Sequence, residues 1–288
     1  MKTILNNNFR RIVLATLFVI SFGCTEVVDV ELNSADPKIV IEGSITESVD
    51  QAERYNIATV RLSKTIDYFN PKDFPKVTNA IVEISDSEGN TKTLTEVSQG
   101  LYQAHGISSK FGGKYTLNVE VENKFYEAKS ELVKPLQLDS LSHFTNKIDG
   151  MDGDVITYYF KDDPNKEDYA QAKLYVNGKQ ILLDSFDLYS DQYVNGREID
   201  IGIQFLDDTT SATGDRLVKG DVVEIELVSF NKSAYTYFDV LDDLINTDGE
   251  GINFGGNAIP DNPPTNLTND ALGYFGAYSV SRKSITIK

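Results

Sequence analysis

Residues 114–121 read Lys-Tyr-Thr-Leu-Asn-Val-Glu-Val, and this stretch decides the fold class of the chain. Apolar side chains occupy every second position, with polar or charged side chains between them. Because side chains alternate between the two faces of a β-strand, a period of two indicates a strand with one buried face. Residues 122–124 then turn the chain into a second strand-like stretch, 125–131. The region therefore predicts two β-strands joined by a turn.

The same pattern continues on both sides of this region. Asn177-Gly178 is the strongest short signal for a β-hairpin, because its turn needs positive φ at both residues. Threonine, valine, isoleucine and tyrosine are plentiful, which also favours strands. Further short apolar or alternating stretches lie at 38–43, 58–62, 80–84, 156–160, 174–176, 181–183, 199–205, 223–227 and 274–287.

One segment has a helical pattern instead. Tyr237, Leu241 and Leu244 follow one another at a spacing of three or four residues, and Ser233 precedes them as an N-cap residue. The pattern predicts a helix near residues 233–246. Its apolar stripe either covers the open edge or end of a sandwich, which is the favoured interpretation, or docks a partner.

Short strands separated by turns are typical of β-sandwiches of the immunoglobulin or prealbumin type. The fold class is therefore predicted to be mainly β, with two tandem β-sandwich units, the second carrying one α-helix. A chain of 288 residues is long enough for two domains of ordinary size. We expect an N-terminal β-sandwich at 37–136 and a C-terminal β-rich domain at 137–288.

The beginning of the chain has the pattern of an export signal. Three positive residues and no acidic one precede or flank an apolar run, 12–22, which is well short of the ~20 residues that span a bilayer. Gly23-Cys24 follows and resembles the lipobox of bacterial lipoproteins. We predict a lipoprotein signal peptide at 1–23 and lipid attachment at Cys24. An ordinary secretory signal with an incidental cysteine is the alternative.

Cysteine usage favours lipidation. Cys24 is the only cysteine of the sequence, so it has no partner for an internal disulfide, and a free thiol is a liability in an oxidising compartment. Residues 24–36 are polar and acidic and are interpreted as a lipidated tether. No later apolar stretch approaches ~18 residues, so the predicted membrane contact is the N-terminal lipid.

The acidity of the chain argues against one class of partner. The formal net charge is −17, and it becomes about −20 without residues 1–23, which carry three positive charges. Such a surface repels nucleic acid, so we predict no nucleic-acid partner. The acidic residues are spread along the chain, which favours a solvated surface over a single site.

The sequence contains no recognisable catalytic set. His105 and His143 lack ligand-spaced neighbours, so a structural role is preferred to metal binding. No nucleophile-elbow, zinc-protease or P-loop motif occurs, and carboxylate pairs are too numerous to indicate a glycosidase dyad. Residues 149–154 place three aspartates in a Gly-rich turn without the order of an EF-hand, so an acidic hairpin loop is preferred to a calcium site. We predict no enzyme activity, no catalytic residue, no cofactor and no metal.

The second predicted unit is rich in tyrosine, and aromatic rings can stack on sugar rings. The absence of tryptophan weakens this interpretation, because tryptophan offers the largest stacking face, and tyrosine also packs at sheet edges. No ligand-binding residue is assigned. The tyrosines of interest are Tyr158, Tyr159, Tyr175, Tyr189, Tyr193, Tyr235 and Tyr237.

Several segments, taken in order, carry a family resemblance. They are Cys24-Thr-Glu-Val-Val-Asp, Lys38-Ile-Val-Ile-Glu-Gly-Ser-Ile, Val60-Arg-Leu-Ser-Lys-Thr, Asn79-Ala-Ile-Val-Glu-Ile-Ser-Asp, Gly100-Leu-Tyr, Gly113-Lys-Tyr-Thr-Leu, Gly255-Gly-Asn-Ala-Ile and Leu272-Gly-Tyr-Phe-Gly-Ala-Tyr. Together they resemble the DUF4249 family of uncharacterised Bacteroidetes outer-membrane lipoproteins. The resemblance implies an outer-membrane lipoprotein, often encoded beside TonB-dependent transporters of the SusC type. It supplies no catalytic or ligand residues.

The leading functional hypothesis is a non-enzymatic outer-membrane lipoprotein, lipid-anchored on the cell-surface or periplasmic face. It would be an accessory or binding subunit of a TonB-dependent, SusC-like transport complex, with the outer-membrane β-barrel as its partner. The alternative is a free-standing surface glycan- or peptide-binding lipoprotein. A weaker alternative is a hydrolase with an unrecognised site.

Overall fold

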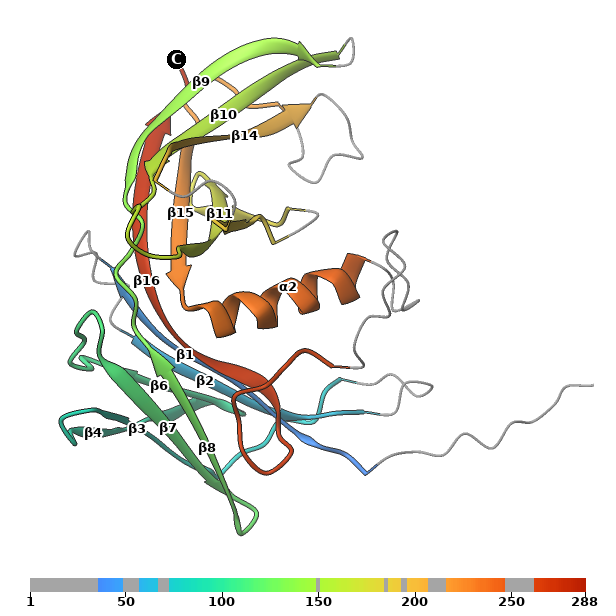
Figure 1. Ribbon diagram of the computed structural model, residues 1–288. Helices are drawn as coiled ribbons and strands as arrows, with labels where there is room; N and C mark the ends of the chain where they lie inside the picture. The colour runs from blue at the N-terminus through green and yellow to red at the C-terminus, as the bar shows by residue number, and fades with distance from the viewer. Residues whose placement is uncertain are drawn as a thin grey trace, which may run out of the picture. The chain divides into compact units, whose positions relative to one another are not determined.

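The computed structural model (Figure 1) describes residues 36–48, 57–66, 73–148, 151–183, 186–192, 196–206, 216–246 and 262–288. Residues 37–288 form one compact unit. The predicted signal peptide, Cys24 and the tether up to residue 35 lie outside the described residues. Their assignment therefore stays a prediction.

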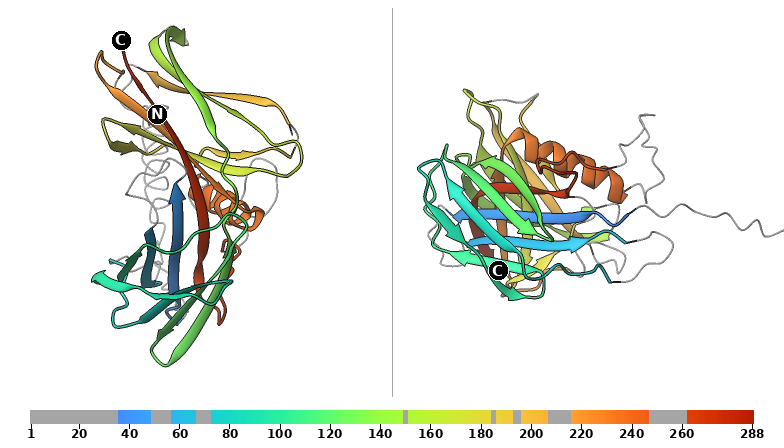
Figure 2. Two further views of the ribbon diagram at one scale, coloured as in Figure 1. Left: turned by 90° about the vertical axis from the view of Figure 1, so that its left-hand side faces the viewer. Right: turned by 90° about the horizontal axis from the view of Figure 1, so that it is seen from below.

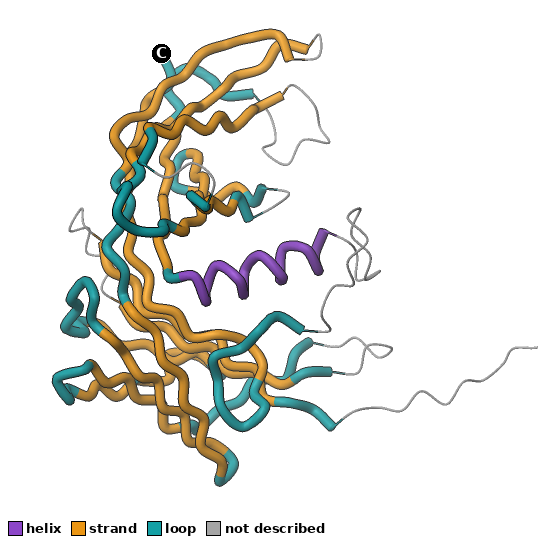
Figure 3. Tube along the Cα trace, in the orientation of Figure 1, coloured by secondary structure: helices purple, strands orange, loops and turns teal. Residues whose placement is uncertain are grey.

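Strands dominate the described residues (Figure 3), as the sequence predicts. The strands are β1 (Ile39–Ser48), β2 (Ile57–Lys64), β3 (Ile81–Asp86), β4 (Thr91–Thr93), β5 (Thr95–Ser98), β6 (Leu101–His105), β7 (Lys114–Val121), β8 (Lys124–Glu131), β9 (Leu138–Ile148), β10 (Met151–Lys161), β11 (Tyr169–Val176), β12 (Lys179–Ile181), β13 (Leu188–Ser190), β14 (Glu198–Leu206), β15 (Val222–Phe230) and β16 (Leu272–Thr286). The helix is α2 (Lys232–Asn246).

These strands form three sheets. The largest has nine strands, with the order β12-β11-β15-β16-β1-β2-β6-β5 and β13 paired with β11. A four-stranded sheet has the order β4-β3-β7-β8, and a three-stranded sheet has the order β14-β10-β9. Neighbouring strands are antiparallel except for β1 and β16, which run parallel. This arrangement lets each smaller sheet cover a different part of the large one.

The first core lies between the four-stranded sheet and the β1, β2 and β6 part of the large sheet. The stretch at 114–121 forms β7, and its alternate residues are buried as its period of two predicts. Ile41, Val60 and Leu62 on β1 and β2 belong to the same core. Two sheets that face each other across an apolar layer form a β-sandwich, which confirms the predicted fold class.

The second core lies between the three-stranded sheet and the two neighbouring strands β11 and β15 of the large sheet. Phe160 of β10, Phe205 of β14 and Ile225 of β15 meet there. The predicted hairpin is confirmed in its expected place, because β11 and β12 pair on either side of Asn177-Gly178. Both turn residues have positive φ, 50° and 78°.

The last strand, β16, contributes to both cores. Its first part pairs with β1 from Leu272 to Val280, and its second part pairs with β15 from Ser279 to Thr286. Figure 2 shows this long strand running past both groups of strands. The chain therefore returns to its first strand at its very end. The predicted division at residue 136 itself stays a prediction.

Helix α2 begins directly after β15, and its N-cap differs from the expected one. The side chain of Asn231 accepts a hydrogen bond from the Ala234 backbone N–H at 3.0 Å, so Asn231 caps the helix. The expected cap, Ser233, instead shares a 2.5 Å hydrogen bond with the Tyr274 hydroxyl. Ser233 therefore bonds to a tyrosine beside the start of the helix and does not act as its N-cap.

A third apolar cluster lies under α2, between the two cores. Ala234 of the helix is buried there, with Phe230 of β15 and Val280 of β16. Phe238 makes ring contacts with Phe230 and Tyr278. The apolar stripe of the helix therefore covers a face of the large sheet. Among the described residues, no helix combines the length and apolar character needed to cross a membrane.

Candidate functional site

An aromatic groove of about 240 Å³ lies where α2 meets the large sheet. Helix α2 forms one wall, and strands β1, β2 and β16 form the other. Four of its lining side chains are aromatic, and two others form an ion pair. We call this site the aromatic groove; its lining residues are Glu42, Gly43, Ser44, Thr59, Arg61, Tyr237, Phe238, Leu241, Tyr274 and Tyr278.

Strand β16 and helix α2 bring Tyr237, Tyr274 and Tyr278 together. Tyr274 and Tyr278 are four residues apart on β16, so the alternation of a strand places both on one face. Gly276 lies between them, and a Cβ at that position would overlap the Tyr278 ring. Tyr237 of α2 stacks on Tyr274, with ring centroids 5.0 Å apart and an interplanar angle of 30°. The rings therefore form a shaped apolar surface.

Charged groups stand beside the rings. Arg61 of β2 and Glu42 of β1 are opposite each other in the strand register, and the Nε–Oε2 distance is 3.9 Å. Both side chains are more than half exposed. Burial raises the pKa of the Tyr237 hydroxyl, and the Glu42 charge raises it further, so this group stays protonated and able to donate a hydrogen bond. Chemically, the groove offers stacking faces together with hydrogen-bonding and charged groups.

The tyrosines singled out by sequence contribute little to this groove. Tyr237 lines it, whereas Tyr158 and Tyr189 are buried in the second core. Tyr193 lies outside the described residues. Three more are not lining residues: Tyr159, Tyr175 and Tyr235.

Sequence reasoning missed Tyr274 and Tyr278. A signal was present, because the two tyrosines of Tyr-Phe-Gly-Ala-Tyr share one strand face and flank a glycine. What the sequence lacked was the position of α2, which supplies the opposite wall.

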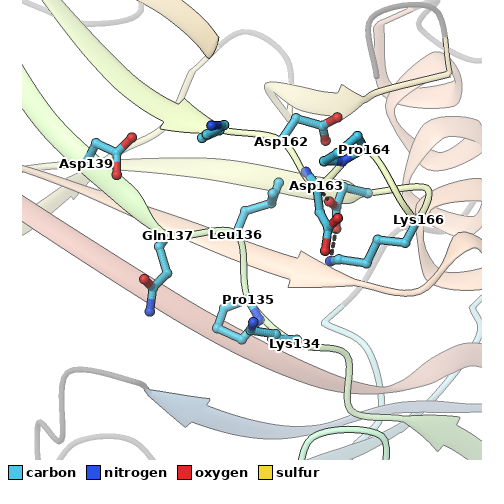
Figure 4. Close-up of a pocket in the computed structure, with 11 residues that line it drawn as sticks. Lys134, Pro135, Leu136, Gln137, Asp139, Asp162, Asp163, Pro164 and Lys166 are labelled. Carbon is cyan, nitrogen blue, oxygen red and sulfur yellow. Dashed lines mark hydrogen bonds and ion pairs between the residues drawn. The ribbon is translucent and has the colours of Figure 1, made fainter. Parts of the chain in front are cut away.

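A second feature is a group of three buried aspartates, Asp162, Asp168 and Asp191. One carboxylate oxygen of each lies within 4.8 Å of the others. Asp162 follows β10, Asp168 precedes β11, and Asp191 follows β13. Asp162 and Asp168 also line a cavity of about 350 Å³, shown in Figure 4 beside the segment 134–137. In the sequence these aspartates are part of an acidity that is spread along the chain, and no spacing singles them out.

The environment of Asp162 disfavours the charged form of its carboxyl group. Burial raises the pKa of Asp162, the hydrogen bond from the Gly196 backbone N–H opposes this, and the charges of Asp191 and Asp168 raise the pKa further. Burial and the same three carboxylates also raise the pKa of the Tyr189 hydroxyl. The pKa shifts of Asp162 and Tyr189 therefore both favour the protonated, uncharged side chain.

The candidate residues from sequence analysis occupy different places. His143 on β9 hydrogen-bonds to Asp154 on β10 at 2.9 Å, and Arg216 Nε lies 3.1 Å from the same carboxylate. Burial raises the pKa of Asp154, but hydrogen bonds from His143 and Arg216 outweigh it and hold the pKa below the usual value. His105 lies on β6, in another sheet. Asp149 lies outside the described residues, so the acidic hairpin loop at 149–154 stays a prediction.

Comparison with solved structures gives remote likenesses. A two-domain fibronectin type III segment of chicken tenascin is 12% identical, with 68% of this chain and 92% of that chain covered and a TM-score of 0.23. The Yersinia pseudotuberculosis adhesin InvE is 15% identical, with 67% of this chain and 55% of that chain covered and a TM-score of 0.21. No curated protein matches the sequence.

The facing sheets and their apolar cores define a mainly β protein of the β-sandwich class. The chain belongs to the family described as "Domain of unknown function (DUF4249)", whose model matches residues 25–284. The family resemblance read from the sequence segments is thereby confirmed.

Proposed function

We propose that this protein is a non-enzymatic, lipid-anchored outer-membrane protein that serves as an accessory or binding subunit of a TonB-dependent transport complex. The aromatic groove is the observation that carries the binding role. It combines exposed charge with tyrosine rings that are held in place by a strand and a helix, and such rings lose little conformational entropy when a ligand binds. The proposed partner is the outer-membrane β-barrel of the complex.

The anchor part of the proposal rests on the N-terminal sequence. Cys24 follows an apolar run and a glycine, and it is the only cysteine in the chain. One acyl chain holds a protein weakly to a membrane, whereas two or more hold it stably. A multiply acylated Cys24 would therefore suffice to keep the β-sandwich at the membrane.

Replacing Cys24 with alanine is expected to release a folded protein into the soluble fraction, because the change removes the acylation site and leaves residues 37–288 intact. Membrane fractionation followed by circular dichroism measures both effects. Serine at the neighbouring position, Thr25→Ser, is the matched control and should remain in the membrane fraction. If the Cys24→Ala protein stayed with the membrane, the lipid-anchor proposal would be wrong.

The partner is tested by affinity purification of the native lipoprotein from membranes in mild detergent. We expect an outer-membrane β-barrel of the TonB-dependent type to be recovered with it in stoichiometric amount. The Cys24→Ala protein, which should lack membrane residence, serves as the control for non-specific capture. Recovery of the lipoprotein without a β-barrel would rule out the subunit role.

The aromatic groove also favours a second candidate, a free-standing glycan- or peptide-binding lipoprotein. In this case the protein would bind its ligand through the same surface without a transporter. Purified protein that binds oligosaccharides or peptides, but brings no β-barrel with it, would favour this second candidate.

Both candidates predict that Tyr237→Ala weakens ligand binding. Loss of one stacking ring should reduce affinity by up to about tenfold, since an aromatic pair contributes about 0.5–1.5 kcal/mol beyond its buried area. The measurement is binding to arrays of oligosaccharides and synthetic peptides. Tyr159→Ala on β10 is the matched control, because Tyr159 lies in the three-stranded sheet and does not line the groove. Equal binding by both variants would exclude the groove as the ligand site.

A further inference from the structure

We propose that Asp162, Asp168 and Asp191 form a binding site for a hard divalent cation, calcium. The three residues come from separate positions around β10, β11 and β13, and the fold brings one carboxylate oxygen of each within 4.8 Å of the others. Oxygen atoms at such separations can bind one ion together, because calcium–oxygen distances are about 2.3–2.6 Å. This site is separate from the aromatic groove.

The charge of the cluster matches a divalent ion. The three aspartates are 1%, 4% and 0% exposed, so water screens their repulsion poorly. The Lys166 ammonium contacts Asp168 and contributes one positive charge. Three carboxylates and one ammonium leave a formal charge of −2, which a divalent cation would balance.

The hydrogen bonding of the carboxylates also points to a ligand. Asp162 Oδ2 accepts a 2.5 Å hydrogen bond from the Gly196 backbone N–H, and Asp168 Oδ2 accepts one from the Asp163 backbone N–H at 3.4 Å. In contrast, Asp162 Oδ1 and both carboxylate oxygens of Asp191 are buried without a hydrogen-bond partner in the described part of the chain. Buried carboxylate oxygens normally have partners, since leaving them without one is strongly unfavourable.

An independent observation comes from Tyr189, which is not acidic. Tyr189 is only 8% exposed. Its hydroxyl is buried and has no hydrogen-bond partner among the described residues. The hydroxyl is close enough to all three aspartates for their charges to act on it. Tyr189 ends up in this place because its ring packs edge-on against Phe160 in the second core, with centroids 4.9 Å apart. A buried polar group of a core residue, without a hydrogen-bond partner among the described residues, thus lies near the same cluster.

The donor atoms select the type of ion. Carboxylate oxygens suit calcium, magnesium and manganese, whereas zinc and copper sites favour nitrogen or sulfur ligands. Magnesium demands a near-octahedral set of ligands and keeps several waters, while calcium accepts irregular oxygen sets. Three carboxylates from three loops or strand ends form an irregular set, so calcium is the ion that fits best.

The test uses the full-length chain in mild detergent, stripped of metal with a chelator. Adding calcium should raise the melting temperature, with an apparent Kd of about 10⁻⁴–10⁻³ M as in extracellular calcium modules. Terbium, a luminescent calcium substitute, should emit on tyrosine excitation because Tyr189 is adjacent to the site, and the chain has no tryptophan to interfere. Excess calcium should suppress this emission.

Asp191→Asn is the decisive variant. It should lose the calcium-dependent rise in melting temperature and weaken terbium binding by about tenfold or more, since a ligand charge is removed. In chelator it should melt no lower than the wild type, because the change removes a buried carboxylate without partners. Asp200→Asn, an exposed aspartate on β14, is the control with the same loss of charge and should behave like the wild type.

Two results would overturn the proposal. One is a wild-type protein whose melting temperature and terbium emission are the same with calcium and with chelator. The other is an Asp191→Asn protein that responds to calcium as the wild type does, or that is destabilised equally with calcium and with chelator. If Asp191→Asn fails to fold, Asp162→Asn replaces it with the same expected outcome.

Discussion

Replacing Gly273 with alanine is expected to lower the unfolding free energy by about 3 kcal/mol or more, the combined effect of a left-handed backbone and of overpacking. Gly273 has φ of 94°, and a Cβ there would lie 2.2 Å from the backbone oxygen of Ile41. The two residues face each other in the parallel pairing of β1 and β16. Because the close atom belongs to the backbone, no side-chain rotation can relieve the overlap.

Chemical denaturation followed by circular dichroism measures this effect. Gly89→Ala is the matched control, since Gly89 has φ of 88° but has no atom within 4 Å of a Cβ at that position. The control should lose only about 1–2 kcal/mol, which is the penalty of a left-handed residue with a side chain. Equal losses in the two variants would show that the approach of β1 to β16 at this point does not limit stability.

Replacing Arg282 with leucine is expected to lower the unfolding free energy by about 3–5 kcal/mol, because it leaves a buried carboxylate without its main partner. Arg282 of β16 and Glu226 of β15 are opposite each other in the strand register. The Nη2–Oε2 distance is 2.7 Å, and the two side chains are only 8% and 5% exposed. Lys173 is more distant from Glu226, at 3.8 Å, so it would replace the arginine poorly.

The control for this prediction is Arg61→Leu. Arg61 pairs with Glu42 at 3.9 Å, and both side chains are more than half exposed, so the loss should be at most about 1 kcal/mol. The double replacement of Arg282 and Glu226 by leucine should recover most of the stability, because it removes the unpaired charge as well. A double variant as unstable as Arg282→Leu would contradict this electrostatic explanation.

Much of the fold could be predicted because it rests on local patterns. The period of two at 114–121 predicts β7. The turn chemistry of Asn177-Gly178 predicts the β11–β12 hairpin. Strand β9 was missed because it is an edge strand with many polar residues and gives no clear alternation. The helix was located correctly, but its N-cap is Asn231 because Ser233 bonds to Tyr274, a residue 41 positions away.

The candidate sites could be predicted much less well. The aromatic groove needs Tyr237 and Tyr274 to meet, and these residues come from a helix and from a strand at the end of the chain. The calcium site proposed above needs Asp162 and Asp191 to meet, although they follow different strands. No spacing in the sequence marks either meeting.

The sequence by itself determined most of the strands, the hairpin turn and the helix, because each depends on residues that are close neighbours in the chain. Lipid attachment at Cys24 is likewise predicted from neighbouring residues. Only the tertiary structure decided that β16 pairs with β1 as well as with β15. It also decided that tyrosines and aspartates gather in two separate places. Pairing between distant strands depends on burial and register across the whole unit, and period-two patterns are alike in every strand, so they do not specify partners.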